Sequence, residues 1–310
     1  MRFWRTHDLS STQPARVISA KEASASDDVL SLLEPIGIEC LGSDPIMLLV
    51  GSSESRRRLR GIECIVWSGE LPSGSLRRIA TGVYVSSPEM CFLQYCAGHS
   101  VQRSIQYGME LCGSYAVGQD GKGAEYNRER LTTPAKLASF IEKCEGNRGV
   151  RTARRSLEHI LGGSASPLET IVVMLMCMPV RYGGYGLPAP NLNMKLAMSE
   201  QASAIAGKQY FKCDLFWPER NVALEYNSTE FHAEVEAMNS DYQRSNVLGY
   251  MNVTVLLITW DMVRDPDRFE SVCTMLSKHL DYRIKMRIDR REFISRRADL
   301  RGEIMRPLAI

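Results

Sequence analysis

Two apolar runs on either side of a short polar turn constrain the fold of this chain most. The runs cover 209–217 and 222–227, and Pro218-Glu-Arg-Asn separates them. Apolar and aromatic residues bounded by Pro and Asn predict two strands joined as a hairpin. If the four-residue turn forms the loop, the numbers of cross-strand partners sum to 439. Asp214 then lies opposite Glu225.

This pairing brings two carboxylates together on one face of a sheet. Side chains alternate along a strand, so Asp214 shares its face with Lys212, Glu225 and Asn227. Opposed carboxylates about 5 Å apart repel unless something compensates. A divalent cation such as Mg²⁺ would compensate, because it prefers hard oxygen ligands. A solvent-facing hairpin, with the repulsion relieved by Lys212 or Arg220, is the alternative.

The elements around the hairpin predict an α/β domain. An apolar helix begins at Ser166-Pro-Leu-Glu and runs to Met178. A polar helix over 234–249, an apolar strand over 253–259 and a helix over 266–280 follow the hairpin. This order predicts a mixed sheet flanked by helices.

The N-terminal half predicts a separate α+β module. Strands are expected at 46–50 and 62–67, and helices begin at Ser87-Pro and Thr133-Pro. A chain of 310 residues is long for one core. A basic helix over 151–161 ends at two glycines and marks the boundary. We therefore expect domains at 1–150 and 151–285, followed by a basic tail at 286–310.

Charge is distributed unevenly although its net value is only +2. Local basic clusters can follow a phosphate backbone while the whole molecule stays near neutrality. Solvated helix faces explain such clusters equally well. The clusters are Arg56, Arg57, Arg58 and Arg60; Arg148, Arg151, Arg154 and Arg155; and the segment 283–306.

Cysteine spacing and hydropathy bear on the cellular compartment. The nine cysteines are scattered singly within apolar segments, without a C-x-x-C pair, so we expect reduced packing residues. No apolar run reaches the roughly 18 residues that a membrane span needs. The first residues carry no apolar leader. The sequence predicts a cytoplasmic protein without a membrane partner.

The run from Cys213 to His232 resembles small bacterial endonuclease-like domains related to the very-short-patch mismatch repair endonucleases. Asp241-Tyr-Gln-Arg, the apolar segment 253–259 and Trp260 extend the resemblance, which covers 164–280. These domains belong to the PD-(D/E)XK superfamily. The resemblance implies a restriction-endonuclease-like fold and a metal-dependent endonuclease that acts on DNA, with Mg²⁺ or Mn²⁺ as cofactor.

Carried over by position, the resemblance implies that Asp214 and Glu225 bind the metal. Asn227 occupies the place where the superfamily has lysine, and where this subgroup commonly has aspartate. A lysine there would help to activate water or hold the transition state. Lys212, opposite Asn227 in the expected register, could supply an ammonium group instead.

Three further residues match positions of the resemblance. Glu169 matches a helical acid that points a third carboxylate at the metal, although Ser166-x-x-Glu169 is also a capping box. His232 could act as a general base or contact phosphate, because its ordinary pKa lies near neutrality. Arg244 could contact phosphate, or could form a surface pair with Asp241.

Residues 46–145 resemble the N-terminal portions of bacterial proteins fused to this endonuclease-like domain, some of them similar to AbiEi-type antitoxin regulators. The residues that carry this resemblance are Arg56-Arg-Arg-Leu-Arg-Gly, Leu71-Pro-Ser-Gly-Ser, the segment 83–89 and Thr133-Pro-Ala. The start of the chain lacks the helix-turn-helix of those regulators. The resemblance implies a module that binds nucleic acid or a partner.

Three functions follow from these observations. The first is a metal-dependent DNA endonuclease. The second is a non-catalytic, antitoxin-like regulator that binds nucleic acid and retains the nuclease fold, which Asn227 favours. The third is a protein-interaction domain with a vestigial site.

Overall fold

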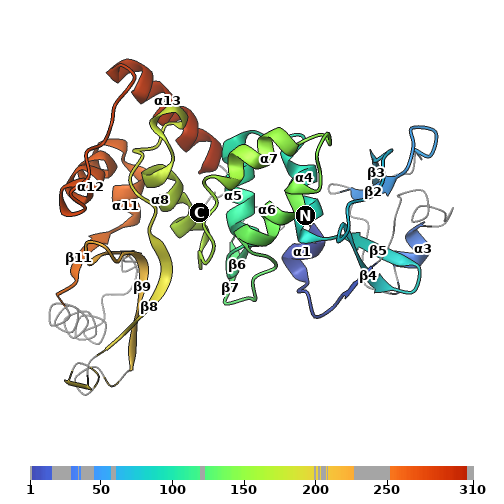
Figure 1. Cartoon of the computed structure of the whole chain (residues 1–310), viewed down its shortest axis with the longest axis horizontal. Helices are drawn as coiled ribbons and strands as arrows, with labels where there is room; N and C mark the ends of the chain where they lie inside the picture. Colours follow the sequence, from blue (N-terminus) through green and yellow to red (C-terminus); the bar gives the residue numbers. More distant parts are fainter. Residues whose placement is uncertain are drawn as a thin grey trace. The chain divides into compact units, whose positions relative to one another are not determined.

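The described chain is a mixture of helices and strands that forms two compact units (Figure 1). The computed structural model describes residues 2–15, 29–33, 35, 45–56, 61–118, 123–198, 200–201, 203, 207, 209–226 and 252–305. Unit 1 comprises 1–99 and 131–155, and unit 2 comprises 100–130 and 156–310. No helix within these ranges is both long enough and apolar enough to cross a membrane.

Unit 1 contains a three-stranded antiparallel sheet, a parallel strand pair and short helices. The sheet has the order β1-β4-β5, and β2 pairs with β3. Its elements are α1 (Arg2–Thr6), β1 (Gln13–Pro14), α3 (Val29–Leu33), β2 (Ile46–Val50), β3 (Ile62–Val66), β4 (Leu76–Ala80), β5 (Val83–Ser86), α4 (Pro88–Cys96) and α6 (Pro134–Glu142). α7 (Val150–Leu157) follows, and the division between the units falls within it.

The helix starts predicted in unit 1 are confirmed by their caps. The Ser87 hydroxyl accepts a hydrogen bond from the Met90 amide at 3.2 Å, and the Thr133 hydroxyl accepts one from the Lys136 amide at 3.2 Å. Proline holds the first helical position in α4 and in α6, where a missing N–H costs nothing. The predicted strands at 46–50 and 62–67 are also present, the second as Ile62–Val66.

Unit 2 is built on a four-stranded mixed sheet of order β11-β10-β9-β8. The central pair is the antiparallel hairpin of β9 (Tyr210–Trp217) and β10 (Val222–Tyr226). The other edge of β9 pairs with β8 (Asn191–Ala197) in antiparallel orientation. The other edge of β10 pairs with β11 (Thr254–Ile258) in parallel orientation. β10 has neighbours on both sides, and its residues 222–225 are buried. The apolar sequence of this strand suits a position within the sheet.

The central helix of unit 2 is α8 (Pro167–Cys177), whose residues from Glu169 to Met176 are all buried. α5 (Val101–Leu111) packs against it and is followed by the β6–β7 pair (Tyr115–Val117 and Ala124–Tyr126). The Tyr115 hydroxyl is within 2.9 Å of the Thr170 hydroxyl, in the buried interior. Residues 100–130 therefore contribute to the core around α8.

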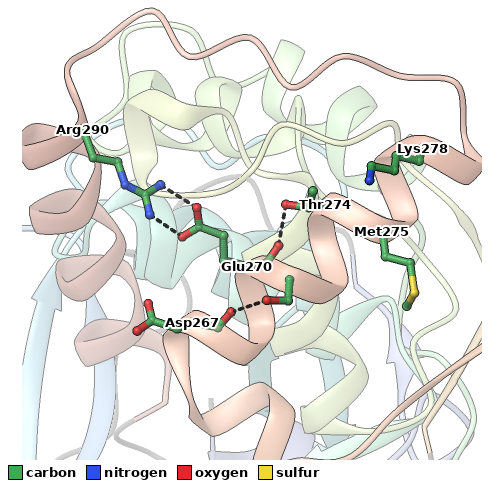
Figure 2. Close-up of a pocket in the computed structure, with 7 residues that line it drawn as sticks. Asp267, Glu270, Thr274, Met275, Lys278 and Arg290 are labelled. Carbon is green, nitrogen blue, oxygen red and sulfur yellow. Dashed lines mark hydrogen bonds and ion pairs between the residues drawn. The ribbon is translucent and has the colours of Figure 1, made fainter.

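Arginine side chains bind the C-terminal helices of unit 2 to one another. α11 (Trp260–Arg264), α12 (Pro266–His279) and α13 (Arg290–Ile304) follow the sheet, and η2 (Val180–Tyr182) packs against α13. Arg290 of α13 donates two hydrogen bonds to Glu270 of α12, at 2.6 and 2.9 Å. Figure 2 shows these two side chains facing each other. Buried Arg297 also donates to Glu270 and to the Tyr185 hydroxyl. The basic tail expected at 286–310 forms a helix over residues 290–304.

Six of the eight cysteines in the described ranges are buried. This agrees with the expectation of reduced packing residues, while Cys40 lies outside those ranges. Burial raises the pKa of the Cys177 thiol to about 12, and that of the Cys144 thiol to about 11. Thiols with such pKa values are poor nucleophiles near neutral pH.

Candidate acidic site in unit 2

The β9–β10 hairpin has the register expected from the sequence. Val222 pairs with Trp217, Ala223 with Phe216 and Leu224 with Leu215, and a turn covers 218–221. Asn221 ends this turn in the left-handed region, at φ 52°, a conformation that asparagine tolerates. The next pair along the same register is Asp214 and Glu225.

Asp214 and Glu225 each bind the backbone of the opposite strand. The Asp214 amide donates to Glu225 Oε1 at 3.2 Å, and the Tyr226 amide donates to Asp214 Oδ2 at 3.0 Å. Glu225 is only 3% exposed and Asp214 is half-buried. These crossed hydrogen bonds offset part of the repulsion between the carboxylates, because each places the positive end of a backbone N–H dipole against a carboxylate oxygen. The two acids are thus held at one end of the paired strands.

Glu169 forms the capping box that the sequence suggested. Its amide donates to the Ser166 hydroxyl at 3.1 Å, and that hydroxyl in turn lies 3.1 Å from Glu169 Oε1. The Ala165 amide donates to Oε2 at 2.9 Å. Its position in the first turn of α8 also suits a negative charge near the helix N-terminus. Capping accounts for the glutamate at this position whether or not it binds a ligand.

The carboxyl of Glu169 is nevertheless electrostatically linked to the hairpin. Burial raises its pKa above the ordinary value, while hydrogen bonds from Ala165 and Asn193 act in the opposite direction. The negative charge of Asp214 raises the same pKa further. Glu169 and Asp214 are therefore close enough for their charges to interact, although they lie on a helix and a strand that are far apart in sequence.

Asn193 was not identified from the sequence, and it binds Glu169 from the strand that pairs with β9. Its Nδ2 atom donates to Glu169 Oε2 at 2.6 Å and to the Gly163 carbonyl at 2.9 Å. Leu192 pairs with Leu215 and Met194 with Cys213, so Asn193 lies opposite Asp214. The alternation of polar and apolar residues over 191–197 could have indicated strand β8 and this residue.

The oxygen ligands suit a hard cation such as Mg²⁺, but a complete metal cluster is not seen. Asp214 and Glu225 offer carboxylate oxygens on adjacent strands, as Mg²⁺ requires. Within the ranges that the structure describes, no group of three or more His, Cys, Asp and Glu side chains is placed to hold a metal ion. A metal bound by Asp214, Glu225 and Glu169 remains a prediction.

Lys212 is exposed on β9, two residues before Asp214. Its cross-strand partner on β8 is Lys195, whose ammonium lies over the Tyr210 ring, 4.4 Å from the ring centre. Two lysines facing each other on adjacent strands provide positive charge at this end of the hairpin. The proposed catalytic ammonium of Lys212 stays a prediction.

Several predicted site residues lie outside the described ranges. They are Asn227, His232, Arg244, Arg57 and Arg58. Among the described residues of unit 1, Arg56 and the α7 residues Arg151, Arg154 and Arg155 are exposed. Arg154 lies 3.9 Å from Glu145 in a solvent-exposed ion pair, which contributes little to stability. The role of these arginines in binding nucleic acid stays a prediction.

The basic tail uses part of its charge internally. Arg297 and Arg301 of α13 are buried, and Arg290 and Arg296 form ion pairs with Glu270 and Glu292. The Arg301 guanidinium donates to the Val263 carbonyl at 2.6 Å. Arg290, Arg297 and Arg301 therefore bind α13 to α11 and α12, whereas the Arg296–Glu292 pair lies within α13.

A shallow groove of about 520 Å³ lies along α12 (Figure 2). It is lined by charged and polar side chains, together with Met275, and the Glu270–Arg290 pair lies at its edge. None of the predicted site residues that the structure describes lines this groove. The carboxylates on β9, β10 and α8 therefore remain the candidate functional site.

Comparisons with known proteins add a distant likeness. No family model and no solved structure matches the chain. Two proteins of Mycobacterium tuberculosis, from strains CDC 1551 / Oshkosh and ATCC 25618 / H37Rv, are each 27% identical to it over 148 residues. The match covers 47% of this chain and 49% of each relative, so it spans about half the length of these curated relatives. Both are named as uncharacterized proteins.

Proposed function

We propose that unit 2 is an endonuclease that hydrolyses phosphodiester bonds in DNA with Mg²⁺ or Mn²⁺. The observation that carries the proposal is the meeting of Asp214 and Glu225 at one end of the β9–β10 pair. Each carboxylate is oriented by a backbone amide of the opposite strand. The charge of Asp214 also reaches Glu169. Asp214 and Glu225 would offer carboxylate oxygens of the kind that a hard cation prefers.

The order of elements supports the same proposal. A helix carrying Glu169, an antiparallel hairpin carrying Asp214 and Glu225, and a strand parallel to β10 form one mixed sheet with flanking helices. This is the arrangement expected from the resemblance to endonuclease-like domains. The agreement in the order of elements along the chain and in the hairpin register supports a restriction-endonuclease-like sheet.

The residues divide the chemistry among themselves. Asp214 and Glu225 would hold the cation, with Glu169 as a third carboxylate. A bound divalent cation acidifies water and offsets charge on a phosphate. Backbone hydrogen bonds fix the carboxylates before a substrate arrives, which reduces the cost of reorganisation. Lys212 would place an ammonium near the phosphate, and His232 would accept a proton from water.

Cleavage of DNA by wild type and by Asp214→Asn tests the proposal. The asparagine keeps an oxygen for the Tyr226 amide and removes the charge, so the hairpin should stay folded. With Mg²⁺ or Mn²⁺ we expect wild type to nick or linearise supercoiled plasmid, and the variant to lose at least about 100-fold in rate. Glu219→Gln, an exposed acid in the turn of the same hairpin, is the matched control.

Two outcomes would contradict the endonuclease proposal. One is the absence of cleavage by folded wild type across plasmid and oligonucleotide substrates with either metal. The other is equal cleavage by wild type and Asp214→Asn, which would point to a contaminating nuclease. Circular dichroism of each variant shows whether the fold is retained.

Lys212→Ala tests the catalytic ammonium separately. Because Lys212 is exposed on β9, its removal should cost less than about 0.5 kcal/mol in stability. We expect cleavage to slow by at least about 10-fold. Unchanged cleavage by Lys212→Ala would remove this residue from the mechanism.

A non-catalytic regulator that binds nucleic acid is the second candidate. The observation that favours it is Asn227, which stands where the superfamily has lysine. This function predicts DNA binding that weakens steeply with salt, because counterions are released from the phosphates. Salt-sensitive binding by both wild type and Asp214→Asn, without cleavage by either, would favour the regulator.

A further inference from the structure

Strands β8 and β9 extend beyond β10 as a two-stranded ribbon (Figure 1). Within the described part of the chain, residues 194–197 and 210–213 pair only with each other. Lys195 lies opposite Lys212 and Ala197 lies opposite Tyr210, so the alternation of side chains places these four on one face of the ribbon. All four residues are exposed. We call this surface the ribbon face.

The two lysines bring like charges together on the ribbon face. Like charges directly opposite each other on neighbouring strands destabilise a sheet. Among the described residues, no carboxylate forms an ion pair with either ammonium group. Lysine on an edge strand such as β8 discourages pairing with other chains, but β9 is an inner strand, so this explanation does not cover Lys212. A polyanion bound across the ribbon face would neutralise both charges.

Tyr210 adds an aromatic ring beside the ammonium groups. The Lys195 ammonium lies over this ring, 4.4 Å from its centre, and the attraction between cation and ring holds the two together. Tyr210 nevertheless keeps 47% of its surface exposed. Ala197, which lies opposite, has only a methyl group and leaves the ring uncovered. Exposed rings beside cations are typical of surfaces that bind single-stranded nucleic acid, because bases stack on the ring while phosphates contact the cations.

The ribbon face continues into the candidate acidic site. Asp214 follows Lys212 by two residues on the same face of β9, an advance of about 7 Å along the strand. Glu225 lies beside Asp214 on β10 and accepts a hydrogen bond from its amide. A polynucleotide that contacts both lysines can therefore extend to the two acids.

We propose that the ribbon face binds single-stranded DNA, with a base stacked on Tyr210 and phosphates at Lys195 and Lys212. The inference deepens the proposed function, on which it rests for the role of the bound strand as substrate. Bases in a duplex are stacked on one another, whereas an unpaired base offers its face to an exposed ring. The ring therefore favours an unpaired strand over a duplex. This binding requires no metal ion.

Fluorescence anisotropy of the full chain in EDTA tests the ring without cleavage. The probe is a labelled oligonucleotide of about 20 nucleotides, used alone or annealed to its complement. We expect Tyr210→Ala to weaken binding of the single strand at least about 10-fold and to leave duplex binding unchanged. Tyr210→Phe keeps the ring and should bind as wild type does. Tyr126→Ala is the matched control, because Tyr126 is 56% exposed and lies on β7, outside the ribbon.

The salt dependence of binding tests the two lysines. Loss of one phosphate contact should reduce the slope of log affinity against log salt concentration by about 0.7 for a single strand. We expect this reduction in Lys195→Ala and in Lys212→Ala, whereas Tyr210→Ala should keep the wild-type slope. Lys278→Ala, which removes an exposed lysine of α12, is the matched control and should also keep the wild-type slope.

The outcomes keep this inference apart from the endonuclease proposal. Wild-type affinity in Tyr210→Ala, or equal weakening of single-stranded and duplex binding, would overturn the ribbon face as a site for a single strand. Unchanged salt slopes in both lysine variants would overturn it as well. The expected binding by a chain that cleaves no DNA would support the ribbon face and remove the endonuclease.

Discussion

At the scale of single residues, one carboxylate can serve two tasks. Glu169 caps α8 through Ser166 and Ala165, and it also feels the charge of Asp214. The sequence presents these as competing explanations, because a capping box requires no further role. The structure establishes the cap and leaves one lone pair for another partner. Burial of this group has a consequence for stability that can be measured.

Replacing Glu169 with Gln should change how stability depends on pH. Burial raises the pKa of Glu169 in the folded chain, so the folded state holds the proton more tightly than the unfolded state does. This contribution to stability is present at low pH and is lost as pH rises from the ordinary value of 4.5 through the raised pKa. The stability of Glu169→Gln should therefore increase relative to that of wild type as pH rises.

Thermal unfolding between about pH 4 and pH 7 provides the measurement for Glu169→Gln. The difference in melting temperature between variant and wild type should shift towards the variant as pH rises. Glu219→Gln, in the exposed hairpin turn, controls for the loss of a charge. A difference that stays constant with pH, or moves the other way, would show that the carboxyl is not buried as described.

Whether a site residue could be predicted from the sequence depends on whether its contacts are local or long-range along the chain. Asp214 and Glu225 could be paired from the sequence, because an antiparallel hairpin with a known loop has a fixed register. Asn193 could not be linked to them in the same way. Its contact with Glu169 spans 24 residues and depends on how a helix meets a sheet. The local pattern of residues in the sequence carries no information about how a helix packs against a sheet.

At the scale of elements, helices with strong local sequence signals were predicted correctly, and elements with weak signals were missed. Capped helices such as α4, α6 and α8 begin where Ser or Thr precedes Pro. Strand β8 was missed, because it is half polar and follows a segment rich in Gly and Pro. Helix α5 was missed as well, although Ser100 caps it. Their stability comes mainly from packing rather than from local propensity.

Docking of α13 depends on a close approach at Gly183. A Cβ atom there would lie 2.2 Å from the Arg296 carbonyl oxygen, and Gly183 has φ 91°. We expect Gly183→Ala to destabilise unit 2 by about 2–4 kcal/mol, from backbone strain and the forced separation of α13. Chemical denaturation with fluorescence detection would measure this change in the free energy of unfolding.

Gly186→Ala is the control that separates strain from collision. Gly186 has φ 65°, but nothing lies within 4 Å of the position that an added methyl group would take. Gly186→Ala should therefore lower the free energy of unfolding by the backbone strain alone, about 1–2 kcal/mol. If Gly183→Ala and Gly186→Ala lower the free energy of unfolding equally, the close approach of α13 to Gly183 adds nothing to the backbone strain.

At the scale of the whole molecule, the two units are interleaved along the chain. Unit 2 takes residues 100–130 from the N-terminal half, and unit 1 takes 131–155 after them. Buried Ile105 and Met109 of α5, and Tyr115 of β6, belong to the same unit as α8. Reading along the chain gives no signal for this exchange, because it arises from contacts between distant segments.

A fragment of residues 156–310 should not fold cooperatively. It lacks α5, which packs against α8, and the Tyr115 hydroxyl that meets Thr170. We expect a broad thermal transition by circular dichroism and exposed apolar surface that binds a hydrophobic dye. A fragment of 100–310 with a Gly/Ser linker in place of 131–155 should melt cooperatively. A sharp transition for 156–310 alone, at the temperature of the linked fragment, would contradict this.

The crossed hydrogen bonds of Asp214 and Glu225 bear on how this site changes during evolution. Each carboxylate binds a backbone amide at the end of the hairpin, so selection for a folded sheet alone would favour both acids, with or without catalysis. If the proposed relationship to endonuclease-like domains holds, Asn227 stands where those domains have lysine, and a change there would leave these two hydrogen bonds in place. The acidic pair alone therefore does not establish nuclease activity, which an assay has to show.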